Sequence, residues 1–158
     1  MAATIFFSHS SRDRDWCELL ALEARKVGVE TYFAEHDPQP GTPLADKVKR
    51  NITGCDAFVV LLTHNTANSA YVHQEIGCAL THGKLVIPLI QPGIGEEQLA
   101  MLKGLEYIEF DFDNPHAGIE SFSAAIRRVA EKQHKQGDVE TLLAVALCVA
   151  LLVILLSE

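Results

Sequence analysis

The chain has 158 residues, which is enough for one domain built around a single hydrophobic core. Apolar residues make up 48% of it and charged residues 22%, a composition typical of globular rather than disordered chains. The formal net charge of −8 argues against nucleic-acid binding, because such proteins need a basic face to neutralise phosphates.

Apolar runs alternate with longer amphipathic segments from the N-terminus onward. The run TIFFS predicts a buried first strand at residues 4–8. A helix follows, in which Ser10 is placed to cap the first turn and Asp13 to supply the carboxylate of a capping box. Gly28 ends this helix, and a second strand is predicted at residues 29–34.

A loop with three prolines and one glycine, residues 35–43, separates the second strand from the next helix. Thr42 caps this helix, with Pro43 at the first helical position, where a missing N–H costs little. The later elements follow in chain order: strand 57–63, helix 70–82, strand 85–90, a short helix near 96–103, strand 107–111 and helix 117–135.

Five strands that alternate with five helices predict an α/β domain. We expect a flavodoxin-like, five-stranded parallel sheet with helices on both faces. Ligands of such sheets bind beyond the carboxyl ends of the strands, near the switch in strand order. Those ends are Ser8 and His9, residues 35–41, and Thr63 and His64.

The C-terminal segment, residues 139–157, differs in kind from the rest of the chain. Residues 142–156 form an unbroken apolar run that would be hydrophobic on every side of a helix. With its flanks the segment approaches the about 20 residues that span a bilayer, and basic residues precede it. We therefore expect a domain at residues 1–136 and a C-terminal transmembrane helix, which makes the chain a tail-anchored membrane protein with its domain in the cytoplasm. The alternative is a helix packed into the core of an oligomer.

Glu75 is the only acidic residue of the predicted helix 70–82. On that helix it shares one stripe with Tyr71, Cys78 and His82. The neighbouring stripe would face the sheet, which places Glu75 at the edge of the buried face; it comprises Val72, Ile76, Ala79 and Leu80. Isolated glutamates are mostly solvated, so the pattern leaves open whether Glu75 is a surface residue or a catalyst.

Four segments together resemble a Toll/interleukin-1 receptor (TIR) domain: FFSHSSRDRD, EHDPQPGTPL, DAFVVLLT and YVHQEIGCALTHGKLVIPLI. The resemblance covers residues 3–133 in the right order and spacing. YVHQE is similar to the segment of NAD-cleaving TIR domains in which an aromatic residue precedes the catalytic glutamate by four positions. The resemblance thus implies that Glu75 is catalytic and that Tyr71 is its aromatic neighbour, where tryptophan is more common.

The resemblance also implies a pocket for the nicotinamide ribose. By this resemblance Phe6 and Ser8 would line it, and they could both face the ligand, since they alternate with Phe7 and so point the same way. Phe33 is a further substrate-binding candidate. From the residue pattern alone, Phe6 and Phe33 fit the hydrophobic core equally well.

Residues 35–43 resemble the BB loop of TIR domains, which mediates assembly and borders the active site. Asp37, Pro40 and Gly41 would make these assembly contacts, although the loop also fits a rigid turn. The partners implied are NAD+, other TIR domains in a homo-oligomer or filament, and a membrane through the tail. No nucleic acid is among them.

A single carboxylate suits NAD+ cleavage. Ordinary glycosidases use two, because a poor leaving group must be protonated. Nicotinamide leaves a cationic pyridinium as a neutral molecule, so Glu75 would only bind the ribose and stabilise its developing positive charge. The products would be nicotinamide with ADP-ribose or a cyclic isomer, and NAD+ is the substrate, with no further cofactor.

We therefore predict an NAD+ nucleosidase of bacterial antiphage immunity that is activated by assembly. The alternative is a membrane-anchored adaptor or membrane-disrupting effector that acts only by TIR–TIR oligomerisation. A response-regulator receiver is disfavoured, because Ser8-His9 and Thr63-His64 stand where its acidic residues would be.

No metal site is expected. The four cysteines are scattered without a CxxC pair, which favours free thiols over disulfides or zinc. The candidate ligands His64, His73, His82 and Cys78 lack a spacing that would complete a zinc site.

Overall fold

The computed structural model describes residues 2–33 and 44–156. The elements, in chain order, are β1 (Thr4–Ser8), η1 (Ser11–Asp13), α1 (Arg14–Lys26), β2 (Glu30–Phe33), α2 (Leu44–Gly54), β3 (Ala57–Leu62), α3 (Ala70–Thr81), β4 (Leu85–Ile90), α4 (Glu96–Leu99), η2 (Ala100–Leu102), β5 (Ile108–Glu109) and α5 (His116–Leu156). They follow the predicted order. The helix cap predicted at Thr42 and Pro43 lies outside the described residues.

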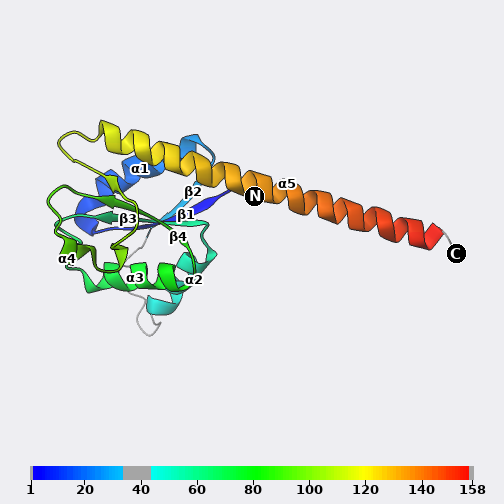
Figure 1. Cartoon of the computed structure of the whole chain (residues 1–158), viewed down its shortest axis with the longest axis horizontal. Coiled ribbons are helices and arrows are strands. Elements are labelled where there is room, and N and C mark those ends of the chain that lie inside the picture. Colours follow the sequence, from blue (N-terminus) through cyan, green and yellow to red (C-terminus); the bar gives the residue numbers. More distant parts are fainter. Residues whose placement is uncertain (1, 34–43, 157–158) are drawn as a thin grey trace.

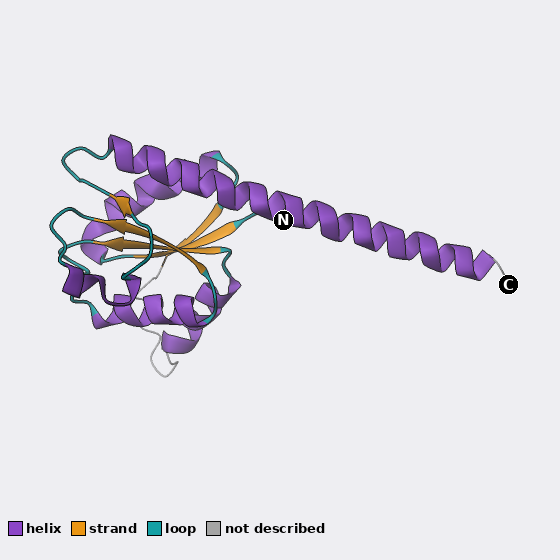
Figure 2. Cartoon of the chain, viewed as in Figure 1, coloured by secondary structure: helices purple, strands orange, loops and turns teal. Residues whose placement is uncertain are grey.

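The five strands form one parallel sheet in the order β2-β1-β3-β4-β5 (Figure 2). This confirms the flavodoxin-like sheet. From β1 the chain continues to one side of the sheet, whereas from β3 it continues to the other. The switch point therefore lies between the carboxyl ends of β1 and β3, where ligands of such sheets bind.

Helices cover both faces of the sheet (Figure 1). Ile5 and Phe7 of β1 pack in the cluster that includes α1 and α5, while Phe6 packs in the cluster that includes α2 and α3. This alternation follows from the two-residue period of a strand. All six residues of β3 are buried, as expected for a central strand with helices on both sides.

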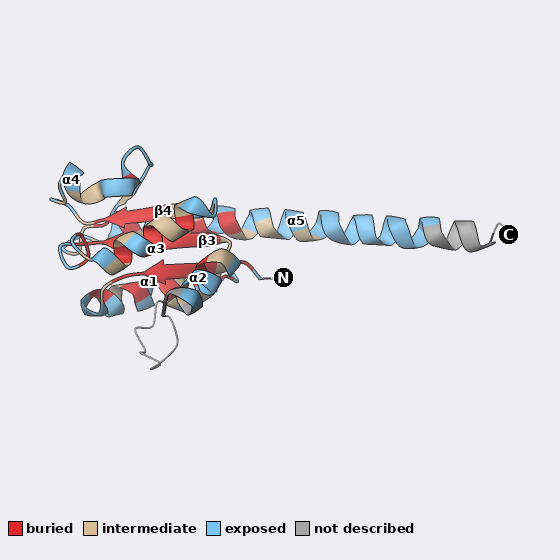
Figure 3. Ribbon diagram, turned by 90° about the horizontal axis from the view of Figure 1, so that it is seen from below, coloured by how far each residue is buried: buried red, intermediate tan, exposed pale blue. Residues whose placement is uncertain are grey.

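The helix α5 has two parts. Its first turns pack on the domain through Phe122, Ile126 and Val129, which are all buried. From residue 138 to residue 150 its side chains are exposed, and the helix projects away from the domain (Figure 3). The large apolar residues exposed there are Val139, Leu142, Leu143, Val145, Leu147 and Val149.

The transmembrane prediction for residues 139–157, and with it the tail-anchored membrane localisation, is wrong. Within residues 2–33 and 44–156, no helix is long and apolar enough to cross a membrane. The uninterrupted apolar run begins only after the charged residues Asp138 and Glu140. Residues 142–156 alone fall short of the about 20 apolar residues that a membrane span requires. Packing of this helix in an oligomer core stays a prediction.

Candidate active site

Ser8 and Glu75 meet at the carboxyl end of the sheet. Ser8 is the last residue of β1, and its Oγ donates a hydrogen bond to Oε2 of Glu75 on α3. Ser8 is fully buried and Glu75 is 3% exposed. Burying a carboxylate costs free energy unless it accepts hydrogen bonds. The bond from Ser8, 67 residues away in the chain, offsets part of this cost.

The helix α3 places Glu75 by burying its neighbours. Ser69 caps the helix, and its side chain accepts a hydrogen bond from the Val72 N–H at 3.4 Å. Val72, Ile76 and Ala79 pack on the sheet, as the sequence predicted. Glu75 lies beside this buried row rather than on the solvated side.

The predicted stripe around Glu75 differs in exposure from end to end. Tyr71, one turn before Glu75, and Cys78, one turn after it, are half-buried. His82 is exposed, and its Nδ1 lies 2.8 Å from the Cys78 carbonyl oxygen. Tyr71 thus places a partly accessible aromatic ring one turn before the buried carboxylate of Glu75.

The two predicted phenylalanines lie on opposite faces of the sheet. Phe6 is fully buried on the side of α3 and stacks on Phe58, with ring centroids 5.8 Å apart. Phe33 is half-buried on the other side and stacks on Phe7 at 5.5 Å. The fold therefore places Phe6 on the same face as Ser8, but it does not bring Phe33 to that face. The assembly-loop residues Asp37, Pro40 and Gly41 lie outside the described residues.

A second polar cluster at the same end of the sheet centres on the buried Asp13, which contacts the buried Thr63 and the exposed Asn65. The predicted capping box does not use this carboxylate, since Ser10 accepts from the Arg12 N–H and Asp13 binds residues far along the chain. Asp13 Oδ2 accepts from Thr63 Oγ1 at 2.7 Å, and Oδ1 accepts from Asn65 Nδ2 at 2.8 Å. Sequence reasoning placed Thr63 at a strand end but gave no sign of this pairing.

The loop between β3 and α3 is held by its own hydrogen bonds. Thr66 Oγ1 accepts from the Thr63 N–H at 2.7 Å and donates to the Leu61 carbonyl at 3.0 Å. The Ala67 N–H donates to the Thr63 carbonyl at 2.8 Å, and His73 Nε2 donates to the Ala67 carbonyl at 2.8 Å. Because these bonds run from the end of β3 into α3, the loop connects the two elements rigidly.

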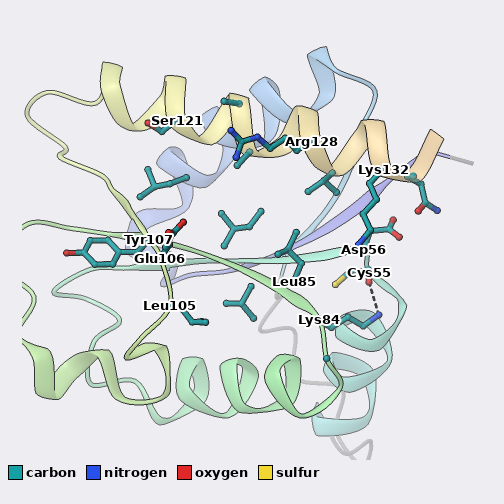
Figure 4. A pocket seen from close by; sticks show the side chains of 18 of the residues that line it. Cys55, Asp56, Lys84, Leu85, Leu105, Glu106, Tyr107, Ser121, Arg128 and Lys132 are labelled. Carbon is teal, nitrogen blue, oxygen red and sulfur yellow. Dashed lines mark hydrogen bonds between the residues drawn. The ribbon is translucent and has the colours of Figure 1, made fainter. Parts of the chain in front are cut away.

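The opposite, amino end of the sheet carries a groove of about 1060 Å³ between α5 and the start of β4 (Figure 4). Asp56, Lys84, Tyr107 and Arg128 are among the residues that line it. These residues precede β3, β4 and β5 or lie on α5, so the groove is separate from Ser8 and Glu75.

Two buried cysteines are poor nucleophiles. Burial raises the pKa of the Cys55 thiol from 9.0 to about 11, despite the opposing effect of the Lys84 charge. Burial also raises the pKa of the Cys17 thiol well above its usual range, with Asp13 and Glu18 adding to the effect. Since the thiolate is the reactive form, neither residue offers cysteine chemistry at neutral pH.

A family model described as TIR domain matches residues 5–128 of the chain. The chain is similar in structure to a CMP N-glycosidase, BcmB, from Clostridium botulinum, at 19% identity and a TM-score of 0.56, over 77% of this chain and 98% of that one. No curated protein matches the chain in sequence.

Two further solved structures are similar. One is a metazoan TIR-STING receptor from C. gigas, at 20% identity and a TM-score of 0.62, over 78% of this chain and 39% of that one. The other is the TIR domains of the activated Roq1 resistosome, at 16% identity and a TM-score of 0.50, over 82% and 84%. At these identities the likeness concerns the fold.

Proposed function

The chain belongs to the TIR domain family, and from this premise we propose that it is an N-glycosidase that cleaves NAD+ and releases nicotinamide. The observation that carries the proposal is the buried hydrogen bond between Ser8 and Glu75 at the switch point of the sheet. The likeness to a CMP N-glycosidase supports the same class of bond cleavage.

Glu75 stabilises the positive charge that develops on the ribose. With 3% of its surface exposed, the carboxylate lies in a region of low effective dielectric. Its attraction for an oxocarbenium-like ribose is therefore stronger than it would be in water. A carboxylate has about four acceptor positions, so Glu75 can bind a ribose hydroxyl while it accepts from Ser8.

The reaction needs no general acid. When the bond between C1′ of the ribose and the pyridinium nitrogen breaks, its electron pair goes to that nitrogen and nicotinamide leaves as a neutral molecule. Water then forms a bond to C1′ and loses a proton, which gives ADP-ribose. If a nitrogen of the adenine attacks C1′ instead, the product is a cyclic isomer.

Ser8, Tyr71 and Phe6 support Glu75 in this proposal. The Ser8 hydroxyl orients the carboxylate, because its hydrogen bond fixes one of the two oxygens. Tyr71, half-buried one turn before Glu75, provides a ring surface for nicotinamide. Phe6 supports the site from beneath by stacking on Phe58. We assign Phe33 to the core cluster on the other face.

We further propose that copies of the chain assemble through their TIR domains and that assembly raises the rate of NAD+ cleavage. The likeness to the TIR domains of the Roq1 resistosome supports such assembly. That resistosome recognises a pathogen effector, which also supports a role for this chain in immune signalling.

The test is to incubate the purified full chain with NAD+ over a range of protein concentrations and to follow nicotinamide by chromatography. We expect release that rises more than linearly with protein concentration. Glu75→Gln keeps the shape but removes the charge, and we expect it to lower the rate about 1000-fold. The matched control is Glu120→Gln, an exposed glutamate of α5, which should leave the rate unchanged.

Three outcomes would change the conclusion. Release of cytosine from CMP, without release of nicotinamide from NAD+, would keep the bond class and replace the substrate. No base release from either nucleotide at the highest concentration would favour a TIR adaptor over an enzyme. Equal turnover by wild type and Glu75→Gln would remove Glu75 from the mechanism.

A further inference from the structure

Asp13 connects the two chain segments that carry the candidate site. It lies five residues after Ser8, at the end of η1 and directly before α1, and it is 2% exposed. Its two carboxylate oxygens accept from Thr63 Oγ1 and Asn65 Nδ2, both in the loop that follows β3. Two charge-assisted hydrogen bonds thereby connect the segment after β1 to the loop after β3.

Further hydrogen bonds connect this loop to α3, the helix that carries Glu75. Asn65 N–H donates to Thr63 Oγ1 at 3.1 Å, and Ala67 N–H donates to the Thr63 carbonyl at 2.8 Å. Ala67 in turn accepts from His73 on α3, which lies two residues before Glu75. An unbroken series of hydrogen bonds thus runs from Asp13 into α3.

Two bridges therefore join the same two segments. One is the hydrogen bond from Ser8 to Glu75, which is part of the candidate site. The other is the contact of Asp13 with Thr63 and Asn65, which takes no part in the proposed chemistry. Because the second bridge has two bonds to one buried carboxylate, it fixes both the distance and the orientation of the loop relative to β1.

We propose that Asp13 is a positioning residue, which acts through Thr63 and Asn65 to set the spacing between Ser8 and Glu75. The inference rests on the proposed NAD+ cleavage. Misplacement of a catalytic group by about 1 Å can lower the rate by about 100-fold, so a small shift of α3 has a large effect on turnover. The effect falls on kcat rather than on KM, because the charge that Glu75 stabilises develops only in the transition state.

The test exchanges the side chains of Asp13 and Asn65. N65D places a second carboxylate against Asp13 and should lower kcat about 100-fold, because like charges push the loop from β1. D13N/N65D restores the pair with the amide donating to the carboxylate, and the amide oxygen introduced at position 13 can still accept from Thr63. We expect this double variant to recover kcat to within about tenfold of wild type.

The control for the added charge is N68D. Asn68 is exposed like Asn65 and lies in the same loop, but the side chains that Asp13 binds are those of Thr63 and Asn65, so the kcat of N68D should equal that of wild type. Thermal unfolding of each variant shows whether a lower kcat reflects loss of the fold. The inference is overturned if N65D retains wild-type kcat, or if D13N/N65D is no more active than N65D.

A second measurement separates this inference from the proposed function. Hydrogen exchange of the amides in residues 63–73 measures how firmly the contacts of Asp13 hold the loop and the start of α3, and it requires no turnover. N65D should raise these exchange rates, and D13N/N65D should restore them. If wild type releases no nicotinamide but exchange follows this pattern, the proposed function fails, whereas the positioning of the loop by Asp13 is supported. If exchange is the same in wild type and N65D, Asp13 does not position the loop.

Discussion

The two ends of the sheet use polar side chains in different ways. At the amino end, Asp56 accepts from the N–H and the hydroxyl of Thr4, and Lys84 donates to the Cys55 carbonyl. These contacts satisfy backbone groups where strands begin. At the carboxyl end, Ser8 binds Glu75, and both side chains are buried.

Asp13 and Thr63 form a second buried pair of side chains at the carboxyl end. Removing such groups from water costs free energy that a purely structural end can avoid by binding its own backbone. We take the buried side-chain pairs as support for the site that we propose at the carboxyl end of the sheet, whereas the polar contacts of the amino end secure the fold.

Ser8 and Thr4, at the two ends of β1, allow the most direct comparison of the two ends, and Ser8→Ala has the largest expected effect among the variants that test this comparison. Ser8→Ala removes the donor to Glu75 and should lower nicotinamide release about 100-fold, because the carboxylate loses its fixed orientation. Thr4→Val removes the hydroxyl that binds Asp56, while the Thr4 N–H still donates, so turnover should be unchanged. Equal losses of nicotinamide release in Ser8→Ala and Thr4→Val would show that the two ends of the sheet do not differ in their role in turnover.

Alkaline pH should destabilise the protein through the amino end. Burial raises the pKa of Cys55 from 9.0 to about 11, so well below pH 9 the thiol is protonated in both the folded and the unfolded chain. Above pH 9 the unfolded chain ionises first. The Cys55 thiol alone should therefore lower the free energy of unfolding by about 2 kcal/mol between pH 9 and pH 11.

Urea unfolding at pH 8, 9, 10 and 11 measures this loss. Cys55→Ala should make the decline shallower without abolishing it, because burial also raises the pKa of Cys17. A decline of the same steepness in Cys55→Ala would show that other groups are responsible.

Asp56→Asn should have the smallest effect. It keeps an acceptor for Thr4 but replaces a charged oxygen with a neutral one, so we expect the free energy of unfolding to fall by about 1 to 2 kcal/mol. Turnover of the folded protein should match wild type. A loss of turnover at a temperature where Asp56→Asn is fully folded would show that the amino end also supports the chemistry.

Local patterns were enough to predict the elements of the fold. The continuous apolar run of β3 and the spacing of Val72, Ile76 and Ala79 on α3 depend only on neighbouring residues, and both proved correct. The long helix α5 is also local in origin. The cost of Gly137 in a helix interior, about 1 kcal/mol, is too small to interrupt it.

Pairings between distant residues could not be predicted in the same way. The sequence places Ser8 and Thr63 at strand ends, but the partners of Glu75 and Asp13 depend on strand order and register. Phe33 shows the same limit. Alternation along β2 permits either face, and only its register opposite Phe7 assigns Phe33 to the side of α1 and α5.

The projecting part of α5 also determines how the molecule moves through solution. At about 1.5 Å per residue, the part of α5 from residue 138 to residue 156 gives a rod about 30 Å long. A compact chain of 158 residues would have a radius of gyration of about 15 Å. A head with such a rod attached diffuses more slowly and scatters X-rays as a larger particle, so gel filtration would overestimate the mass of a single copy.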